Sequence, residues 1–214
     1  MRVKYDKSAT IYSESEQTGH LHLIVSGSVK VSRRAGDRSI VVDVYGPDEF
    51  FGECTLLDLE RLPEEAVALE ATEVMRWTKS QIEKLVLDRP LLGVAFMQTL
   101  ARRTIALGAR LQDCLGQKTS RRVLRSLVHL SERSGTAGAG GSVSLTPLTH
   151  QQLAEYTGTS RENVTHHMNE FRRQGLLDYW HQGIVLNPRA FQVAERGAYP
   201  EGCVNNATLP GTAA

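Results

Sequence analysis

The chain is poor in the residues that build disulfide frameworks, zinc ribbons and membrane anchors. Only three of its 214 residues are cysteines, Cys54, Cys114 and Cys203. They are far apart and odd in number, which excludes a disulfide framework and any C-x-x-C pair. The sequence contains no apolar run of the roughly 18 residues that a membrane span needs, and its N-terminus lacks the apolar segment of a signal peptide. A reducing cytoplasm is the expected setting.

Strong charge of one sign is also absent, because the formal net charge is only +1. That total conceals an asymmetry. Residues 1–90 hold 12 Lys and Arg against 16 Asp and Glu, a net of −4, whereas residues 118–196 hold 10 against 6, a net of +4. A difference of this size also arises by chance, but it fits nucleic-acid binding by the C-terminal half alone.

Residues 1–90 contain a series of short β-type patterns. The segments "LHLIVSGSVKVS", "SIVVDVYGPDEFFGE" and "AVALEATEVMRW" alternate apolar and polar residues and break at glycine turns. Many short strands at regular spacing predict an antiparallel sandwich, jelly roll or barrel. A short helix, "TKSQIEKLVLDRP", is expected to end this domain before Pro90.

Residues 91–116 are expected to form one long helix, because they contain no proline and end at a glycine. Apolar or small residues recur along it at alternating spacings of three and four, which is the a/d seam of a heptad repeat. Such a seam predicts helix–helix pairing; the alternative is a helix lying on the core of its own domain. The seam consists of Met97, Leu100, Thr104, Leu107, Leu111 and Cys114.

Residues 117–197 read as helices followed by a small hairpin. An amphipathic helix over 118–134 precedes a flexible glycine loop at 135–142 and a brief strand in "VSLTP". Two helices with a tight joint follow, and the hairpin "LLDYWHQGIVLNP" has its turn at 181–183. Residues 198–214 are rich in Gly, Pro, Asn and Thr and are expected to be disordered.

The tight joint between those two helices carries the capping signals of a helix-turn-helix. Thr149 can cap "HQQLAEYTG", Ser160 can cap "RENVTHHMNEFRRQG", and Gly175 closes the second helix. A helix, a turn containing glycine, a second helix and a β wing are the order of the winged helix-turn-helix. The whole chain is thus of the α+β class.

Helical spacing divides the side chains of the second helix into two faces. Val164, Met168 and Phe171 lie at i, i+4 and i+7 and should face the core, with His167 beside them in a packing role. Arg161, Glu162, Thr165 and His166 then face outward. Arginine can donate two hydrogen bonds to a guanine edge, and glutamate can accept one from cytosine. Neighbours on a helix point about 100° apart, so the two histidines do not act as a pair and no metal site is expected.

The segment "GTSRENVTHHMNEFRRQGLL" resembles the recognition segment of the CRP/FNR family of bacterial transcription regulators, whose members often show S-R-E-T-V-x-R. The stretches "HLIVSGSVKV" and "YGPDEFFGE", and the long helix with "LARR", resemble the same family's cyclic-nucleotide-binding roll and dimer helix. The resemblance runs from about Val3 to Arg196. It implies an N-terminal β jelly roll, a dimerisation helix over 91–116 and a C-terminal winged helix-turn-helix.

The resemblance also implies a homodimer that binds near-palindromic DNA with half-sites about one helical turn apart, similar to the family's TGTGA core, and RNA polymerase as a further partner. Arg161, Glu162, Thr165 and His166 are then the expected base-reading residues. His166 stands where many members have arginine, so readout at that base should be weaker or altered. The expected phosphate contacts, which make binding salt-dependent, are Lys118, Arg121, Arg122, Ser160, Arg172 and Arg173.

The expected effector pocket is degenerate. Members that bind cyclic AMP use a Gly-Glu pair, an Arg-Ser pair and hydroxyls from the dimer helix. Gly52 and Glu53 are present, but Leu62-Pro63 replaces the Arg-Ser pair, with Arg61 one residue off register, and the hydroxyl positions fall on Leu107 and Gly108. Regulation without cyclic AMP is therefore the preferred hypothesis. A ligand-dependent activator is the alternative, and a nucleotide-binding subunit acting through protein contacts is a remoter one.

Other chemistry finds little support in the sequence. A cupin-like roll can host metal catalysis, but no triad of histidines and a carboxylate at facial spacing is evident, so an enzyme is not expected. There is no N-terminal cysteine cluster for an iron–sulfur centre. His20 and His22 share one strand face but lack an evident third ligand. No cofactor is therefore expected.

Overall fold

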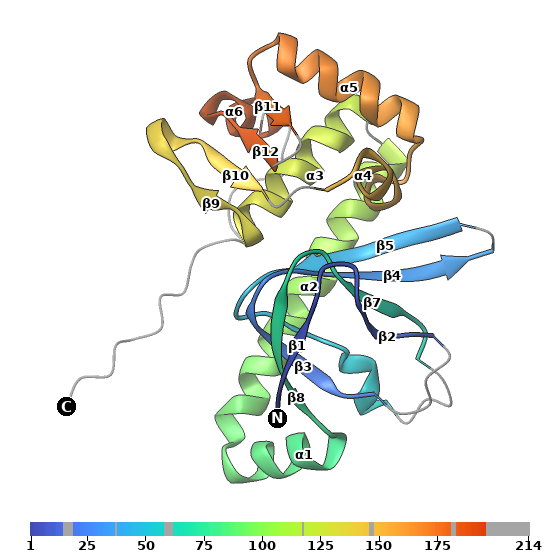
Figure 1. The fold of residues 1–214 in the computed structure, drawn as a ribbon, viewed down its shortest axis with the longest axis vertical. Coiled ribbons are helices and arrows are strands. Elements are labelled where there is room, and N and C mark those ends of the chain that lie inside the picture. Colours follow the sequence, from blue (N-terminus) through green and yellow to red (C-terminus); the bar gives the residue numbers. More distant parts are fainter. Residues whose placement is uncertain are drawn as a thin grey trace.

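The structure is a computed structural model that describes residues 1–14, 19–36, 38–57, 62–116, 118–145, 148–180 and 183–195. It places a β roll at one end and a mainly helical domain at the other, with one long helix alongside both (Figure 1). The described strands of the roll are β1 (Arg2–Tyr5), β2 (Thr10–Tyr12), β3 (Leu21–Ser26), β4 (Val29–Ala35), β5 (Arg38–Tyr45), β6 (Phe50–Phe51), β7 (Glu65–Ala68) and β8 (Thr72–Trp77).

The roll consists of two antiparallel four-stranded sheets with the orders β1-β8-β3-β6 and β2-β7-β4-β5. Alternate residues of the strands point into the space between the sheets, so that Ala66 and Ala68 of β7 and Val74 of β8 are buried. Ile24 and Phe51 complete the centre of this core. The predicted jelly-roll architecture is confirmed, because period-2 alternation places one face of every strand inside.

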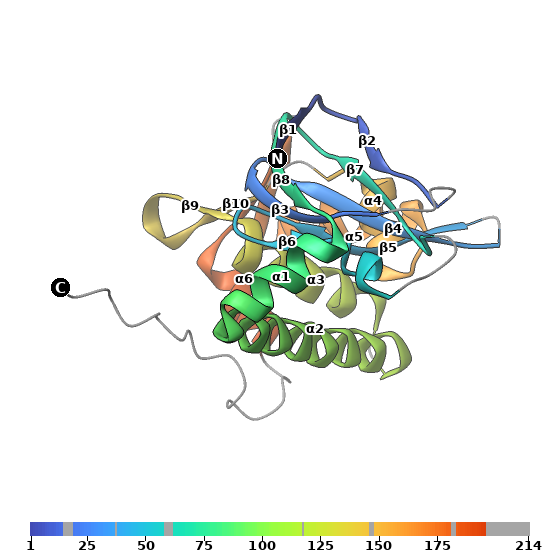
Figure 2. The same ribbon diagram turned by 90° about the horizontal axis from the view of Figure 1, so that it is seen from below.

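Two helices follow the roll. In α1 (Lys79–Asp88) the Thr78 side chain and Gln81 form a capping box. The next helix, α2 (Pro90–Gly116), begins at the proline instead of after it, because the first turn of a helix tolerates a residue without a backbone N–H. Figure 2 shows α2 along one edge of the molecule with α1 beside it.

The C-terminal domain combines four helices with a sheet of order β11-β12-β10-β9. Their bounds are α3 (Thr119–Ser134), β9 (Thr136–Ala137), β10 (Val143–Leu145), α4 (His150–Thr157), α5 (Arg161–Arg173), β11 (Leu177–Trp180), β12 (Gly183–Leu186) and α6 (Pro188–Glu195). One core cluster joins them, with Leu127, Leu153 and Met168 fully buried.

The segment 135–142, expected from the sequence to be a flexible glycine loop, contains regular structure. Residues 136–137 form β9 and pair with β10, and residues 139–141 form a 3-10 turn in which Gly140 and Gly141 have positive φ. Glycines in this segment therefore build a hairpin instead of a linker. The sequence analysis also missed α6, although Pro188 at its first position and the buried Ala190 and Ala194 are helix signals.

Several expectations fall outside the described residues: the tail 198–214, the hairpin turn at 181–182, Arg61 and Cys203. None of the helices within the described ranges is both long enough and apolar enough to cross a membrane.

Candidate nucleic-acid interface

Helix α5 lies at the outer end of the helical domain, on the side away from the roll (Figure 1). Val164, Met168 and Phe171 are buried on its inner face. Arg161 and Glu162 are exposed on its outer face. The predicted division of the helix into two faces is therefore present, because the 3.6-residue period places i, i+4 and i+7 on one side.

The N-terminus of α5 is held by capping. The Ser160 hydroxyl accepts from the backbone N–H of Asn163 at 3.2 Å, and the Asn163 side chain donates to the Thr159 hydroxyl at 3.2 Å. The pKa of the Glu162 carboxyl is lowered by hydrogen bonds from its own backbone N–H and then from the Ser160 side chain. Glu162 is thus kept as a charged acceptor at the exposed start of the helix.

The base-reading candidates line one shallow hollow together with Asn169. The Thr165 hydroxyl is already hydrogen-bonded within the protein. It donates to the Arg161 carbonyl at 2.9 Å and lies 2.8 Å from Nδ1 of His150. His150, in α4, thereby links the two helices of the motif. Arg161, Glu162 and His166 are the exposed members of this set, so they are the side chains most available to a base edge.

The phosphate candidates differ in how far they are free to move. The Arg122 guanidinium donates to the carbonyls of Thr157 at 3.0 Å and Gly158 at 3.4 Å, so it stabilises the end of α4. Arg172 lies 3.5 Å from a carboxylate oxygen of Asp178. Lys118 and Arg173 are exposed, whereas Arg121 is half-buried and engaged with a partner.

His167 packs as expected, but it also meets a carboxylate. Its ring stacks on Phe171 with centroids 6.2 Å apart, and its Nδ1 lies 3.5 Å from Oε2 of Glu170. His166, His167 and Glu170 bring one ligand atom each to within 4.8 Å of one another. The expectation that the two histidines form no metal site concerns that pair alone and leaves out Glu170, which stands at i+4 from His166 and at i+3 from His167.

Within the described residues, the roll's part of the expected effector pocket consists of Gly52 and Glu53, and both have close neighbours. Gly52 has φ of +82°, and a Cβ there would lie 2.6 Å from the His20 carbonyl oxygen, so only glycine fits. Glu53 lies 3.4 Å from the Arg103 guanidinium, which also covers the ring of Tyr45 at 4.5 Å.

The two positions of α2 assigned to that pocket, Leu107 and Gly108, are both exposed, and nothing lies within 4 Å of a Cβ built at Gly108. Across the roll, the buried Glu64 accepts from the Tyr12 hydroxyl at 3.0 Å and meets Arg33 at 3.3 Å. The Glu64 carboxylate is therefore already paired within the chain.

The seam of α2 is exposed in the single chain. Met97 is 64% exposed, Leu107 48% and Leu111 62%. The opposite side of α2 faces the rest of the protein through Phe96, which packs edge-to-face on Phe50, and through Arg103 and Arg110. The alternative prediction, that the seam packs on the core of its own domain, is therefore wrong for these three residues.

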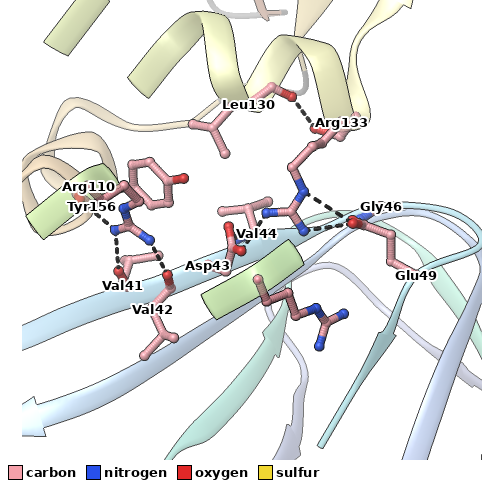
Figure 3. Close-up of polar contacts among 12 residues, drawn as sticks. Val41, Val42, Asp43, Val44, Gly46, Glu49, Arg110, Leu130, Arg133 and Tyr156 are labelled. Carbon is pink, nitrogen blue, oxygen red and sulfur yellow. Dashed lines mark hydrogen bonds and ion pairs between the residues drawn. The ribbon is translucent and has the colours of Figure 1, made fainter. Parts of the chain in front are cut away.

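Arg110 of α2 and Arg133 of α3 make a polar contact between the two halves of the molecule that was not predicted from the sequence (Figure 3). Arg110 of α2 donates to the Val41 and Val42 carbonyls of β5 and to the Tyr156 carbonyl of α4. Arg133, in the last turn of α3, pairs with Asp43 and lies 2.7 Å from Glu49.

The carboxylates of Asp43 and Glu49 raise the pKa of Arg133 despite its burial. Asp43 also accepts from the backbone N–H of Val44, and Glu49 from that of Gly46. Both acids are thus oriented toward Arg133 by the roll's own backbone. Only the folded chain brings residues more than 80 positions apart to this point.

A β roll, a long helix with an exposed apolar seam and a capped, exposed helix-turn-helix define the architecture of a DNA-binding transcription regulator. The chain matches the family models "Cyclic nucleotide-binding domain" over residues 2–89 and "Crp-like helix-turn-helix domain" over residues 121–192. It belongs to the CRP/FNR family of transcription regulators.

Curated relatives agree with this assignment. The chain is 29% identical over 187 residues to the CRP-like cAMP-activated global transcriptional regulator of Mycobacterium tuberculosis, covering 86% of this chain and 83% of that protein. It is 28% identical over 198 residues to the cyclic AMP receptor protein of Thermus thermophilus, covering 92% and 85%. The structure of FixK2 from Bradyrhizobium japonicum shares the fold, with a TM-score of 0.78, 18% identity and coverage of 94% and 98%.

Proposed function

We propose that this regulator binds a near-palindromic, TGTGA-like DNA site as a homodimer and does so without requiring cyclic AMP. The observation that carries the proposal is the exposed outer face of α5, where Arg161, Glu162 and His166 stand at the start of a capped helix. Arg161 supplies the bidentate donor that guanine accepts, and Glu162 supplies an acceptor for cytosine. His166 sets the base preference that differs from members with arginine there.

The dimer is supported by the unpaired seam of α2. Met97, Leu107 and Leu111 expose apolar side chains in heptad register, and burying such surface against a second copy stabilises association. A two-fold axis along α2 would give each copy of α5 one half-site. Lys118 and Arg173 are proposed to meet phosphates, and contact with RNA polymerase rests on the family alone.

Independence from cyclic AMP is supported by the residues of the roll. Glu53 is already paired with Arg103, and Glu64 is buried against Tyr12. At the α2 positions where members that bind cyclic AMP have hydroxyl side chains, this chain has Leu107 and Gly108, whose side chains offer no hydrogen bond. The active arrangement is then the major state of the free protein, and no ligand is needed to shift it.

Selection of DNA sites by the purified protein, with and without cyclic AMP, tests the proposal. We expect the same palindromic site under both conditions. Arg161→Ala should weaken binding by roughly 1–3 kcal/mol and relax preference at one base, whereas Lys84→Ala, an exposed cation on α1, should not. Specific binding that arises only after cyclic AMP is added would favour the ligand-dependent activator that the cAMP-activated relatives suggest.

A further inference from the structure

We infer that His166, His167 and Glu170 form a binding site for one divalent transition-metal ion on α5, and that an ion bound there withdraws His166 from the DNA-facing surface. The withdrawal of His166 from the DNA-facing surface rests on the proposed function. Within the described residues, this is the group of three histidine or carboxylate side chains whose ligand atoms converge to within 4.8 Å.

The spacing suits metal binding on a helix. Glu170 is the i+4 neighbour of His166 and the i+3 neighbour of His167, and these are the two spacings at which side chains meet on one helical surface. Pairs at i and i+4 bind zinc in helical metal motifs. The two imidazole rings lie edge to face with centroids 5.2 Å apart, and each brings a nitrogen to within 4.8 Å of a Glu170 carboxylate oxygen.

The geometry around Glu170 is that of an oriented ligand. Its Oε1 accepts from the side-chain amide of Gln174 at 3.2 Å, while its Oε2 lies 3.5 Å from Nδ1 of His167. A ligating carboxylate is commonly held in this way by an outer hydrogen bond. The Gln174 contact therefore fixes one oxygen and directs the other toward the histidines.

His167 contributes a nitrogen that lacks a hydrogen-bond partner. Its Nδ1 is buried and unpartnered, and its ring is held by stacking on Phe171. Buried polar atoms are normally satisfied, and a metal ion between this nitrogen and Oε2 would satisfy it. His166 and Glu170 are more exposed, so the ion has a path from solvent.

The donor set indicates the class of ion. Two imidazoles and one carboxylate suit Zn²⁺ and similar transition-metal ions better than Ca²⁺ or Mg²⁺, which prefer oxygen. Three protein ligands leave the fourth tetrahedral position for water.

An ion bound here would compete with base readout. His166 lines the hollow with Arg161 and Asn169, whereas Glu170 lies further along the helix. Coordination consumes one ring nitrogen of His166 and ties the ring toward Glu170. We therefore expect Zn²⁺ to weaken binding to the specific DNA site.

Titration of Zn²⁺ against a chromophoric chelator, without DNA, tests the site itself. Glu170→Gln and His166→Gln should each weaken the tightest zinc affinity at least about tenfold, since each removes one of three ligands. Glu155→Gln is the matched control, because Glu155 accepts from Gln151 at 3.0 Å as Glu170 does from Gln174, and it should bind zinc like the wild type. Equal zinc affinities in the wild type, Glu170→Gln and His166→Gln would overturn the inference.

A second measurement tests the effect of bound zinc on DNA affinity, separately from zinc binding itself. DNA affinity is measured first in chelator, which tests the proposed function alone, and then with Zn²⁺. Zinc should weaken binding of the wild type several-fold, reversibly on adding chelator, and leave Glu170→Gln unchanged. Zinc that binds the wild type without changing its DNA affinity would overturn the withdrawal of His166, and an equal loss in both proteins would place the effect elsewhere.

Discussion

The guanidinium carbon of Arg110 lies 3.9 Å from the ring centroid of Tyr156, and the same group donates to the Tyr156 carbonyl at 2.9 Å. Arg110 also donates to the carbonyls of Val41 and Val42 (Figure 3). One side chain of α2 therefore holds α4, the first helix of the helix-turn-helix, against β5 of the roll. Together with the Arg133 ion pairs to Asp43 and Glu49, this contact joins the DNA-binding domain to the roll.

Replacing Arg110 should destabilise the whole molecule. Arg110→Met keeps the apolar stem but removes the donors to three carbonyls, and hydrogen bonds to a charged group contribute roughly 1.5–3 kcal/mol. We expect the free energy of unfolding in urea to fall by about that amount. Arg102→Met, at an exposed position of the same helix, is the control, and equal stability of the two variants would contradict the role of Arg110.

The seam of α2 should govern the oligomeric state. Leu107→Asp places a charge in the centre of the apolar stripe, and losing one buried leucine from each chain removes about 3–6 kcal/mol of association energy. We expect sedimentation or light scattering to report a monomer. Leu87→Asp, on α1 and 80% exposed, should leave the wild-type state unchanged. A Leu107→Asp protein that still dimerises like the wild type would show that the interface lies elsewhere.

Acid should destabilise the roll through His22. This side chain is 3% exposed and stacks on Phe51 at 4.8 Å. Burial, then His20 and Arg76, lower its pKa to about 3. Because the folded pKa lies below the unfolded value of about 6.5, protonation favours the unfolded chain, so stability is present above pH 6.5 and is lost as the pH falls below it.

Urea unfolding of the wild type and His22→Gln across pH 5 to 8 measures this loss. The difference between the two profiles should grow by about 1.4 kcal/mol for each pH unit below 6.5. Groups shared by both proteins cancel in that difference. Parallel profiles would mean that His22 does not titrate with unfolding.

Capping of α5 should affect both stability and DNA binding. Ser160→Ala removes the acceptor for the Asn163 N–H and should cost about 1 kcal/mol of unfolding free energy. Thr149→Ala removes the equivalent cap of α4, where Thr149 accepts from the Gln152 N–H, at a similar cost. Only Ser160→Ala should also weaken DNA binding in a gel-shift assay, since it loosens the start of the reading helix; equal DNA affinity of both variants would contradict this.

The sequence by itself determined the features that depend on local interactions. Alternation predicted the strands of the roll, helical spacing predicted which side of α5 is buried, and Thr149, Ser160 and Gly175 marked the ends of α4 and α5. Hydrogen bonds and periodicity within a few residues decide these features, so they can be predicted from the sequence alone. The heptad spacing of α2 likewise predicted a seam, and the fold leaves that seam exposed.

Only the tertiary structure decided how distant residues combine. Arg122 and Thr165 looked like DNA contacts in sequence, yet one holds the end of α4 and the other bonds His150. Arg110 and Arg133 gave no signal of their own, since their partners lie in β5, in the turn after it and in α4. Such pairings are set by the packing of separate elements, which spacing along the chain does not encode.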